Sequence, residues 1–216
     1  MKLYSYFRSS CAWRVRIALN LKGLQYEIVA VSIRPGVDQQ KAPAFGEVNH
    51  MRQVPVLEIQ ESGSSFRLTQ SVAICEYLDE LYPEPRLLPG DAIKRAQVRE
   101  LVEIIASGIQ PLQNVKVTQH LRQVGGEAAA NDFAKDAIAT GLRAFESHVN
   151  LHGGTYSVGD TLTLADVFLI PQLFNARRFD VDLTTVPRLL DIESRASEHA
   201  AFLMAHPDRQ PDAPST

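Results

Sequence analysis

Cysteine is scarce in this 216-residue sequence, and neither a long apolar run nor a long run of one charge sign is present. The two cysteines, Cys11 and Cys75, lie far apart, without a CxxC pattern or a histidine-rich spacing. This argues against a disulfide scaffold and a metal site, and it favours a reducing compartment. No stretch reaches the ~18 apolar residues of a membrane-spanning helix, and the first residues lack the apolar core of a signal peptide. We therefore expect a cytoplasmic protein with no membrane segment.

Charge is balanced along the chain. The 22 basic and 25 acidic residues give a formal net charge of -3 and are mixed without blocks of one sign. Such a surface argues against nucleic-acid or anionic-membrane partners, although a few arginines could still bind a small anion. Hydrophobic residues make up 45% of the sequence, which is enough for one large or two small folded domains.

The first part of the chain predicts a β-α-β unit. Strands are predicted at 3–7 and at 26–33, where β-branched residues are dense. The helix between them begins after an N-cap at Ser9 or Ser10, and Gly23 ends it.

A β-hairpin and a helix follow this unit. Segment 34–52 is polar and predicts a loop with one short helix. Strands at 54–60 and 66–68 flank the turn 61–65, whose Ser-Gly-Ser centre suits a positive φ. Helical spacing then runs from 70 to 82 and ends before a proline. The order β-α-β, then β-β-α, is typical of a thioredoxin-like domain.

The second half of the chain predicts helices alone. The stretch 83–90 is rich in proline, as linkers between compact units are. Apolar residues then recur at helical spacing, with a break at Gly125-Gly126, in the segments 92–121, 128–148 and 164–179. Thr163 and Asp166 form a capping box, which makes Asp166 structural. The predicted class is α+β, with a thioredoxin-like domain at 1–82, a linker at 83–90 and an all-helical domain at 91–216.

Three features of the first domain predict one ligand site. Residues 9–11 (Ser-Ser-Cys) begin the first helix, and Gln70 and Ser71 begin the helix after the hairpin. A helix N-terminus offers unpaired N–H groups and a positive dipole, which favour an anion. Val54-Pro55 precedes a strand, where a cis bond would turn the Val54 backbone outward to pair with an extended peptide. The pattern indicates a peptide-like anion.

Plain structural explanations compete with this site. Ser9 and Ser10 could only cap a helix, and Cys11 could be a core thiol. Cys75 lies among apolar residues and is expected in the core. The arginines expected on solvated faces or paired with acids are Arg14, Arg16 and Arg177.

Five motifs, in order along the chain, resemble one known family. They are SSCxWRVRIAL, QVPVL, QSxAIxEYL, GIQPLQN and GDxxTLADxxLxPQ, and the resemblance runs from Lys2 to the RQPDAP near the end. The sequence is similar to the zeta class of glutathione transferases. The SSCxWR and GIQPLQN elements are specific to that class. This resemblance implies the glutathione transferase fold, with a helical domain that forms the substrate pocket and the contact of a homodimer.

The resemblance also implies glutathione as cofactor. At its thiol end the matching positions are Ser9, Ser10, Cys11, Ala12, Trp13 and Arg14. Elsewhere in the first domain they are Gln40 for the glycyl end, Val54 and Pro55 for the cysteinyl backbone, and Gln70 and Ser71 for the γ-glutamyl carboxylate. From the helical domain they are Gln110, Asn114, Val115 and Lys116.

The implied reaction is a cis–trans isomerisation of a small diacid. A thiolate adds to the conjugated double bond of maleylacetoacetate, the new single bond rotates, and the thiolate leaves to give fumarylacetoacetate, a step of aromatic amino-acid catabolism. The groups expected to act in catalysis are Ser9, Ser10, Cys11, Gln110 and Arg178, with Cys11 assisting and not attacking. Arg8 and Arg178 are expected to bind the substrate.

Other activities stay open at this point. The resemblance is compatible with maleylpyruvate as substrate, and with glutathione conjugation or dehalogenation of α-halo acids. A non-catalytic scaffold of the same fold is disfavoured because Ser9-Ser10 and Gln70-Ser71 are retained. Two positions depart from the family pattern, namely His50, where proline is usual, and Ala12, where serine is frequent. They bear on glutathione affinity more than on the class of reaction.

Overall fold

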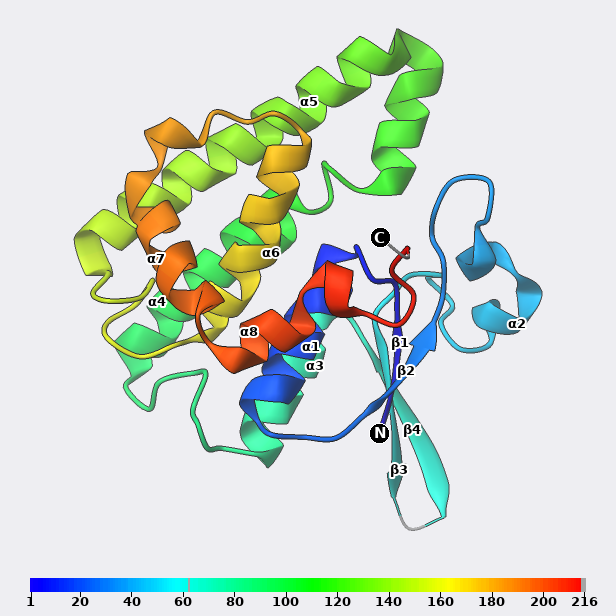
Figure 1. Cartoon of the computed structure of the whole chain (residues 1–216), viewed down its shortest axis with the longest axis horizontal. Helices are drawn as coiled ribbons and strands as arrows, with labels where there is room; N and C mark the ends of the chain where they lie inside the picture. Colours follow the sequence, from blue (N-terminus) through cyan, green and yellow to red (C-terminus); the bar gives the residue numbers. More distant parts are fainter. Residues whose placement is uncertain (62, 215–216) are drawn as a thin grey trace. The chain divides into compact units, whose positions relative to one another are not determined.

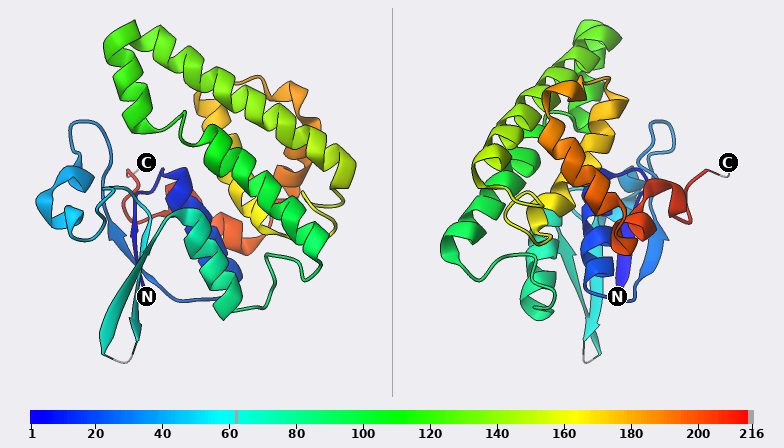
Figure 2. Two further views of the ribbon diagram at one scale, coloured as in Figure 1. Left: turned by 180° about the vertical axis from the view of Figure 1, so that it is seen from behind. Right: turned by 60° about the vertical axis from the view of Figure 1, so that its left-hand side comes forward.

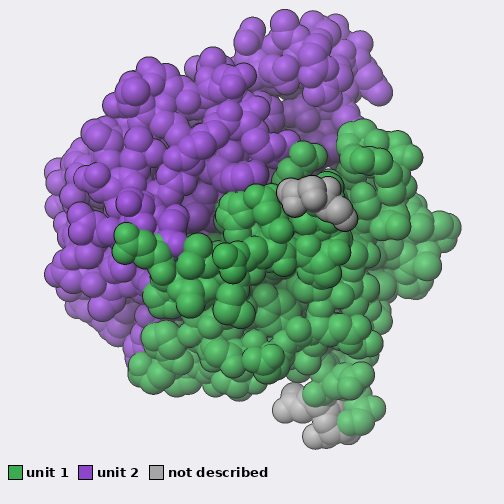
Figure 3. Space-filling view, in the orientation of Figure 1, with its two compact units in different colours: residues 1–85, 198–216 green, residues 86–197 purple. Residues whose placement is uncertain are grey.

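The computed structural model describes residues 1–61 and 63–214, and the chain divides into two compact units, which Figure 3 colours separately. Unit 1 comprises residues 1–85 and 198–216, and unit 2 comprises residues 86–197. Unit 1 contains a sheet with helices, and the regular structure of unit 2 is helical. This arrangement confirms the predicted α+β class. Among the described residues, none of the helices combines the length and apolarity needed to cross a membrane.

A four-stranded sheet with the order β2-β1-β3-β4 organises unit 1. The strands are β1 (Lys2–Ser5), β2 (Glu27–Ala30), β3 (Val56–Glu61) and β4 (Ser64–Thr69). β1 pairs in parallel with β2, as the predicted β-α-β unit requires, and β3 pairs antiparallel with β4 in the predicted hairpin. β1 also pairs antiparallel with β3. Leu3 faces Leu57 across the β1–β3 pair, and both side chains are buried. Burying a leucine of this kind stabilises a fold by about 1.5–3 kcal/mol.

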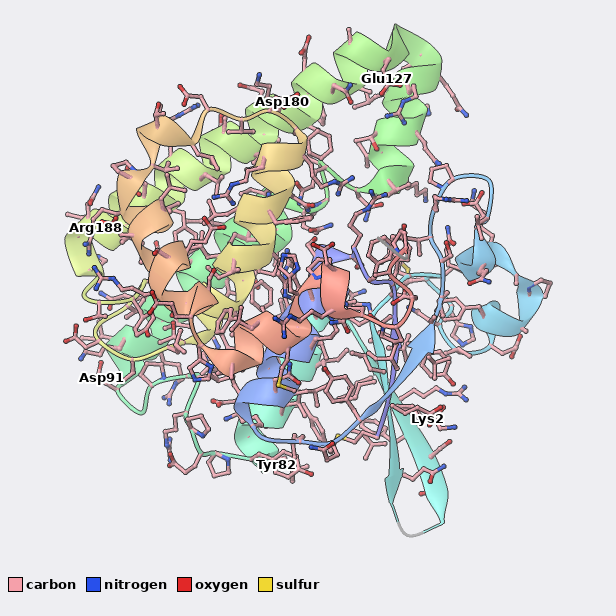
Figure 4. The ribbon with its side chains drawn as sticks, viewed as in Figure 1. Lys2, Tyr82, Asp91, Glu127, Asp180 and Arg188 are labelled. Atoms are coloured by element: carbon pink, nitrogen blue, oxygen red, sulfur yellow. The ribbon has the colours of Figure 1, made fainter. Side chains whose placement is uncertain are left out.

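Two helices of unit 1 pack against each other beside this sheet (Figures 1 and 2). They are α1 (Ser10–Leu21) and α3 (Ser71–Leu81). Gly23 has a φ of +65°, which confirms the predicted stop of the first helix. α3 ends at Tyr82, labelled in Figure 4, directly before Pro83, because the residue before a proline avoids the α conformation.

The loop at 34–52 matches its prediction, whereas the hairpin turn is shorter than the predicted 61–65, because β3 runs to Glu61 and β4 begins at Ser64. Segment 34–52 is irregular apart from the short helices η1 (Gln39–Lys41) and α2 (Pro43–Gly46). In the hairpin turn Gly63 has a φ of +86°, while Ser62 lies outside the described residues. The Val54-Pro55 peptide is cis, as predicted.

Cys75 lies in the core of unit 1, as predicted. Burial raises the pKa of its thiol from about 9 to about 12. In the unfolded chain the thiol ionises near its ordinary pKa, so between these values the folded state binds more protons than the unfolded state. The contribution of this thiol to the free energy of unfolding is therefore fully present below about pH 9, and it is lost as the pH rises toward about 12.

We predict that Cys75→Ala reduces the alkaline loss of stability. The wild-type free energy of unfolding should fall more steeply than that of the variant above pH 9, by up to about 1.4 kcal/mol per pH unit. Urea unfolding of both proteins measures this difference at about pH 8, 9.5 and 10.5, which lie below and within the range between the ordinary and the raised pKa of Cys75. A gap between the proteins that stays constant with pH would contradict the prediction.

The C-terminal segment belongs to unit 1, which corrects the predicted helical domain at 91–216. Helix α8 (Ala200–Ala205) packs on α1 and is followed by η4 (Pro207–Arg209). Asn20 donates to the Ala201 carbonyl at 3.0 Å, and the rings of Trp13 and His206 meet edge to face. Periodicity predicts a helix without showing which unit it packs against, and for this reason the sequence assigned the segment wrongly.

Arg16 anchors the same segment and is buried, which corrects the expectation that it is solvated or paired with an acid. Its guanidinium donates to four acceptors, which are the carbonyls of Tyr6, Phe7 and Ala205 and the hydroxyl of Ser5. The Phe7 N–H in turn donates to the Asp212 carboxylate at 2.9 Å. The chain just before α1 is thus held by both α1 and the C-terminal segment.

Unit 2 is helical, as predicted, but its boundaries differ. It contains α4 (Ala92–Glu103), the π-helical turn η2 (Ile104–Ile109), α5 (Val115–His152), α6 (Leu164–Arg178), the turn η3 (Leu183–Thr185) and α7 (Pro187–Ser197). The predicted helix 92–121 is wrong, because the break falls at 110–114. Gly126, with a φ of +83° and a ψ of 176°, is non-helical and interrupts α5 where the sequence predicts a break, so α5 comprises two helices joined at a kink that is visible in Figures 1 and 2.

Local capping fixes two of these helices as the sequence indicates. Asp91, labelled in Figure 4, accepts from the Lys94 N–H at the start of α4. The predicted capping box at the start of α6 is present, and the buried Asp166 carboxylate accepts from the N–H groups of Ser157 and Thr163. Burial raises the pKa of Asp166, although these hydrogen bonds oppose the shift. The structural role predicted for Asp166 is confirmed.

Candidate active site

The start of α1 presents a hydroxyl and a thiol at the positive end of a helix. Ser9 is the N-cap, extended at φ −69° and ψ 115°, and its Oγ accepts from the Ala12 N–H at 3.3 Å. Its own N–H donates to the Tyr6 carbonyl. Ser10, the first helical residue, is buried, and Cys11 is partly exposed with a free thiol. This end of the helix is suited to an anion such as a thiolate.

Arg14 links this helix start to a second one. It is 1% exposed, and its Nη1 lies 3.7 Å from the Cys11 sulfur and 3.3 Å from the Ser71 hydroxyl. Burial lowers the pKa of Arg14, while the nearby thiols of Cys11 and Cys75 oppose the shift. Arg14 is therefore buried and does not lie on a solvated face. Its buried cation adds positive potential between the two helix starts.

The start of α3 carries a strained residue. Gln70, its N-cap, has a φ of +70° and makes no side-chain capping bond. A positive φ in a residue other than glycine costs about 1–3 kcal/mol and recurs at ligand-binding sites. Ser71 is buried directly behind it. The N–H groups of this turn form a second position for a carboxylate.

The remaining predicted positions of unit 1 are more dispersed. Val54 is buried and lies just before β3, whose paired residues begin at Val56. Gln40 is half-buried in the 34–52 loop, and its Nε2 donates to the Asp38 carboxylate at 3.2 Å. Arg8 is exposed, with its guanidinium 5.6 Å from the centre of the Phe7 ring.

Unit 2 holds the other predicted residues around two helix ends. Gln110 directly follows η2, and π-helical turns occur frequently at functional sites. Asn114 is the N-cap of α5, where its Oδ1 accepts from the Lys116 N–H at 3.0 Å. Val115 and Lys116 begin the same helix and are exposed. Capping explains Asn114 without a ligand.

Two arginines end α6 and differ in their partners. Arg177 forms a two-pronged ion pair with the Glu193 carboxylate at 2.6 and 2.5 Å, as expected for an arginine paired with an acid. Arg178 is exposed, and its Nη1 donates to the Asn175 Oδ1 at 3.1 Å. That bond orients the guanidinium, a group whose planar donors suit a carboxylate.

Sequence reasoning missed the buried amides that contact these residues. Gln113 donates to Gln110 and exchanges hydrogen bonds with Gln172, and Asn175 contacts Arg178. Gln113 lies inside the GIQPLQN motif and Gln172 inside the GDxxTLADxxLxPQ motif. The motifs therefore contained the signal, but nothing in their spacing assigns these amides a partner.

Comparison with known proteins identifies the class to which this fold and site belong. A model of the glutathione S-transferase N-terminal domain matches residues 8–81, and a model of the C-terminal domain matches residues 115–200. The chain belongs to the glutathione S-transferase family.

Individual relatives show which class within this family the chain resembles. Maleylacetoacetate isomerase of Rattus norvegicus is 49% identical over 213 residues, which cover 99% of this chain and 95% of the rat protein. The crystal structure of maleylacetoacetate isomerase from Anaeromyxobacter dehalogenans, with glutathione bound in its active site, is 47% identical at a TM-score of 0.90 and covers 99% of this chain and 97% of that chain. The holo structure of maleylpyruvate isomerase, described as a bacterial zeta-class glutathione S-transferase, is 42% identical at a TM-score of 0.93, with coverages of 99% and 100%. The predicted resemblance to the zeta class is confirmed.

Proposed function

We propose that the protein is a glutathione-dependent cis–trans isomerase that converts maleylacetoacetate to fumarylacetoacetate. The observation that carries the proposal is the pair of helix starts in unit 1. Ser9 and Cys11 begin α1, Ser71 begins α3, and the buried Arg14 contacts both ends. Relatives at 47–49% identity are named for this isomerisation, and one of them holds glutathione in its active site.

The residues present fit glutathione, because three parts of the tripeptide have a suitable partner. The start of α3, with Gln70 and the buried Ser71, suits the γ-glutamyl carboxylate. Val54 suits the cysteinyl backbone, and the start of α1 suits the sulfur. The proposed glutathione positions are Ser9, Ser10, Cys11, Ala12, Trp13, Arg14, Gln40, Val54, Pro55, Gln70, Ser71, Gln110, Asn114, Val115 and Lys116.

Bound glutathione would supply a thiolate that adds reversibly to the substrate double bond. The Ser9 hydroxyl donates to the sulfur and favours its ionised form, as do the N–H groups at the start of α1. Arg14, behind them, raises the local positive potential. Cys11 shapes this end of the site and does not attack.

The substrate itself is a dianion whose carbonyl oxygen gains charge while the double bond becomes single. Arg178, oriented by Asn175, binds a carboxylate, and Arg8 is a second carboxylate partner. The Gln110 amide donates to the oxygen that gains charge. Because glutathione is regenerated, the net reaction changes only the geometry of the double bond.

A parallel assay tests this proposal. Maleylacetoacetate and maleylpyruvate are each supplied with and without glutathione, and formation of the trans product is followed. We expect fast turnover only with glutathione, and a higher kcat/KM for maleylacetoacetate. Equal rates with and without glutathione would contradict the mechanism, whereas preference for maleylpyruvate would contradict only the choice of substrate.

We also propose that the protein is a cytoplasmic homodimer. Support comes from the zeta-class resemblance and from large apolar side chains that the single chain leaves exposed, such as Met51 at 64% and Ile93 at 70%. Light scattering coupled to size-exclusion chromatography should give twice the 24.0 kDa chain mass.

A further inference from the structure

A buried pair of amides joins two helical elements of unit 2. Gln172 in α6 is fully buried, and Gln113, between η2 and α5, is 6% exposed. The Gln113 Nε2 donates to the Gln172 Oε1 at 2.7 Å, and the Gln172 Nε2 donates back to the Gln113 Oε1 at 3.1 Å. A buried amide is costly unless its hydrogen bonds are made, so each side chain depends on the other for its position.

The pair extends to Gln110 and fixes which way that amide faces. The Gln113 Nε2 carries two hydrogens, one directed to Gln172 and the other to the Gln110 Oε1 at 3.1 Å. Because this bond holds the Oε1 of Gln110 toward Gln113, it also fixes the direction in which the Nε2 of the same amide points. Gln113 therefore determines where Gln110 can donate a hydrogen bond to a substrate oxygen.

One face of α6 supports both proposed substrate-binding groups. Gln172, Asn175 and Arg178 are three residues apart, a spacing that keeps side chains on neighbouring positions of a helix. Gln172 holds Gln113, which contacts Gln110, and Asn175 accepts from Arg178. Both supporting amides are buried, whereas Arg178 is exposed.

We propose that Gln172 and Gln113 are positioning residues that orient the Gln110 amide as a hydrogen-bond donor for the diacid substrate. This inference rests on the proposed function, since it assumes that Gln110 donates to the substrate. Leucine or methionine at 172 would fill a similar volume, but it would leave the buried Gln113 amide without its partner and Gln110 without the contact that orients it.

The test is a double-mutant cycle with near-isosteric variants. Gln110→Met should lower kcat by about 10²-fold, the effect of losing one donor to a charged oxygen. Gln172→Met should lower kcat by about 10-fold, because it weakens the same donor without removing it. Adding Gln172→Met to Gln110→Met should cause less than about 2-fold further loss, because residues that act through one group are not additive.

A matched control separates positioning from loss of stability. Thr118 is buried in the same unit and donates to backbone carbonyls of Asn114 and Val115, so Thr118→Val also removes a buried hydrogen-bonding group. It should lower the midpoint of thermal unfolding as Gln172→Met does, while kcat stays within about 2-fold of wild type. Gln113→Met removes the partner amide of Gln172 and so breaks the same hydrogen bonds. It replaces Gln172→Met in the test if that variant fails to fold.

A readout independent of turnover is the side-chain amide signal of Gln110 in nitrogen-15 NMR spectra of the protein without glutathione, assigned by its loss in Gln110→Met. It should shift in Gln172→Met and not in Thr118→Val. A wild-type kcat in Gln172→Met, losses that multiply in the double variant, or an unshifted signal would overturn this inference alone. An unchanged kcat in Gln110→Met would overturn the role of Gln110 in the proposed function and this inference with it.

Discussion

Replacing Ser9 with alanine is expected to lower kcat for isomerisation by about 10²-fold or more, the loss that follows removal of one donor to a charged centre. The hydroxyl both accepts from the Ala12 N–H and, as we propose, donates its hydrogen to the sulfur of bound glutathione. Without it, the pKa of that sulfur should rise by about one to two units. Steady-state kinetics and the pH dependence of thiolate absorbance in the bound state measure both effects.

Controls for this prediction come from the same motif. Ser9→Thr keeps a hydroxyl and should retain most of the activity, while Ser9→Ala should lose only about 1 kcal/mol of stability from the lost cap. Cys11→Ala should have a milder effect on kcat, because its thiol assists and does not attack. The opposite ranking, with Cys11→Ala inactive and Ser9→Ala active, would show that the two roles are reversed.

Replacing Arg16 with methionine is expected to destabilise unit 1 by about 3 kcal/mol or more, because several buried acceptors lose their donor at once and each unsatisfied group costs about 1–3 kcal/mol. Burial lowers the pKa of Arg16 to about 10, so the guanidinium remains charged at neutral pH. Its four acceptors hold the chain before Ser9 and the end of α8, and the variant leaves them without that donor. Urea unfolding at pH 7, well below the shifted pKa, measures the change.

Arg177→Met is the matched control for this arginine. Arg177 is exposed and pairs with Glu193 at the surface, where such a pair is worth about 0–1 kcal/mol. The two variants should therefore differ by about 2 kcal/mol or more. Similar unfolding midpoints for Arg16→Met, Arg177→Met and wild type would contradict the role given to Arg16.

Local features of the sequence predict much of unit 1 because they depend on near neighbours. The N-cap at Ser9, the stop at Gly23 and the helix end at Tyr82 follow from capping and proline rules. The order of strands and helices along unit 1 was predicted because β-α-β and hairpin patterns are set by local sequence. The capping box at Thr163 is equally local and equally correct.

Features that depend on distant residues were not predictable in this way. Arg14 and Arg16 look like surface residues until their partners, Ser71 and the Ala205 carbonyl, are brought beside α1. The assignment of residues 198–214 to unit 1 depends on the same packing. A charged side chain is usually exposed, so sequence rules give the wrong answer where a buried network satisfies it.

The candidate site also contains residues that the sequence predicts and residues that it does not. Its residues at helix starts carry sequence signatures, and the family motifs add Gln110 and Arg178. Of the amides that orient those two side chains, Gln113 lies inside a family motif and Asn175 does not, but neither position indicates its partner, because the partner depends on which helix faces the amide.

The central claim is that glutathione acts as a recycled cofactor in an isomerisation. Its most direct test supplies maleylacetoacetate in about 100-fold excess over glutathione, with the enzyme present at a trace level, and follows the trans product and the free thiol together. The account predicts complete conversion to fumarylacetoacetate with the thiol concentration unchanged at the end. Product formation that stops once the glutathione is consumed, or that proceeds equally well without it, would contradict the account.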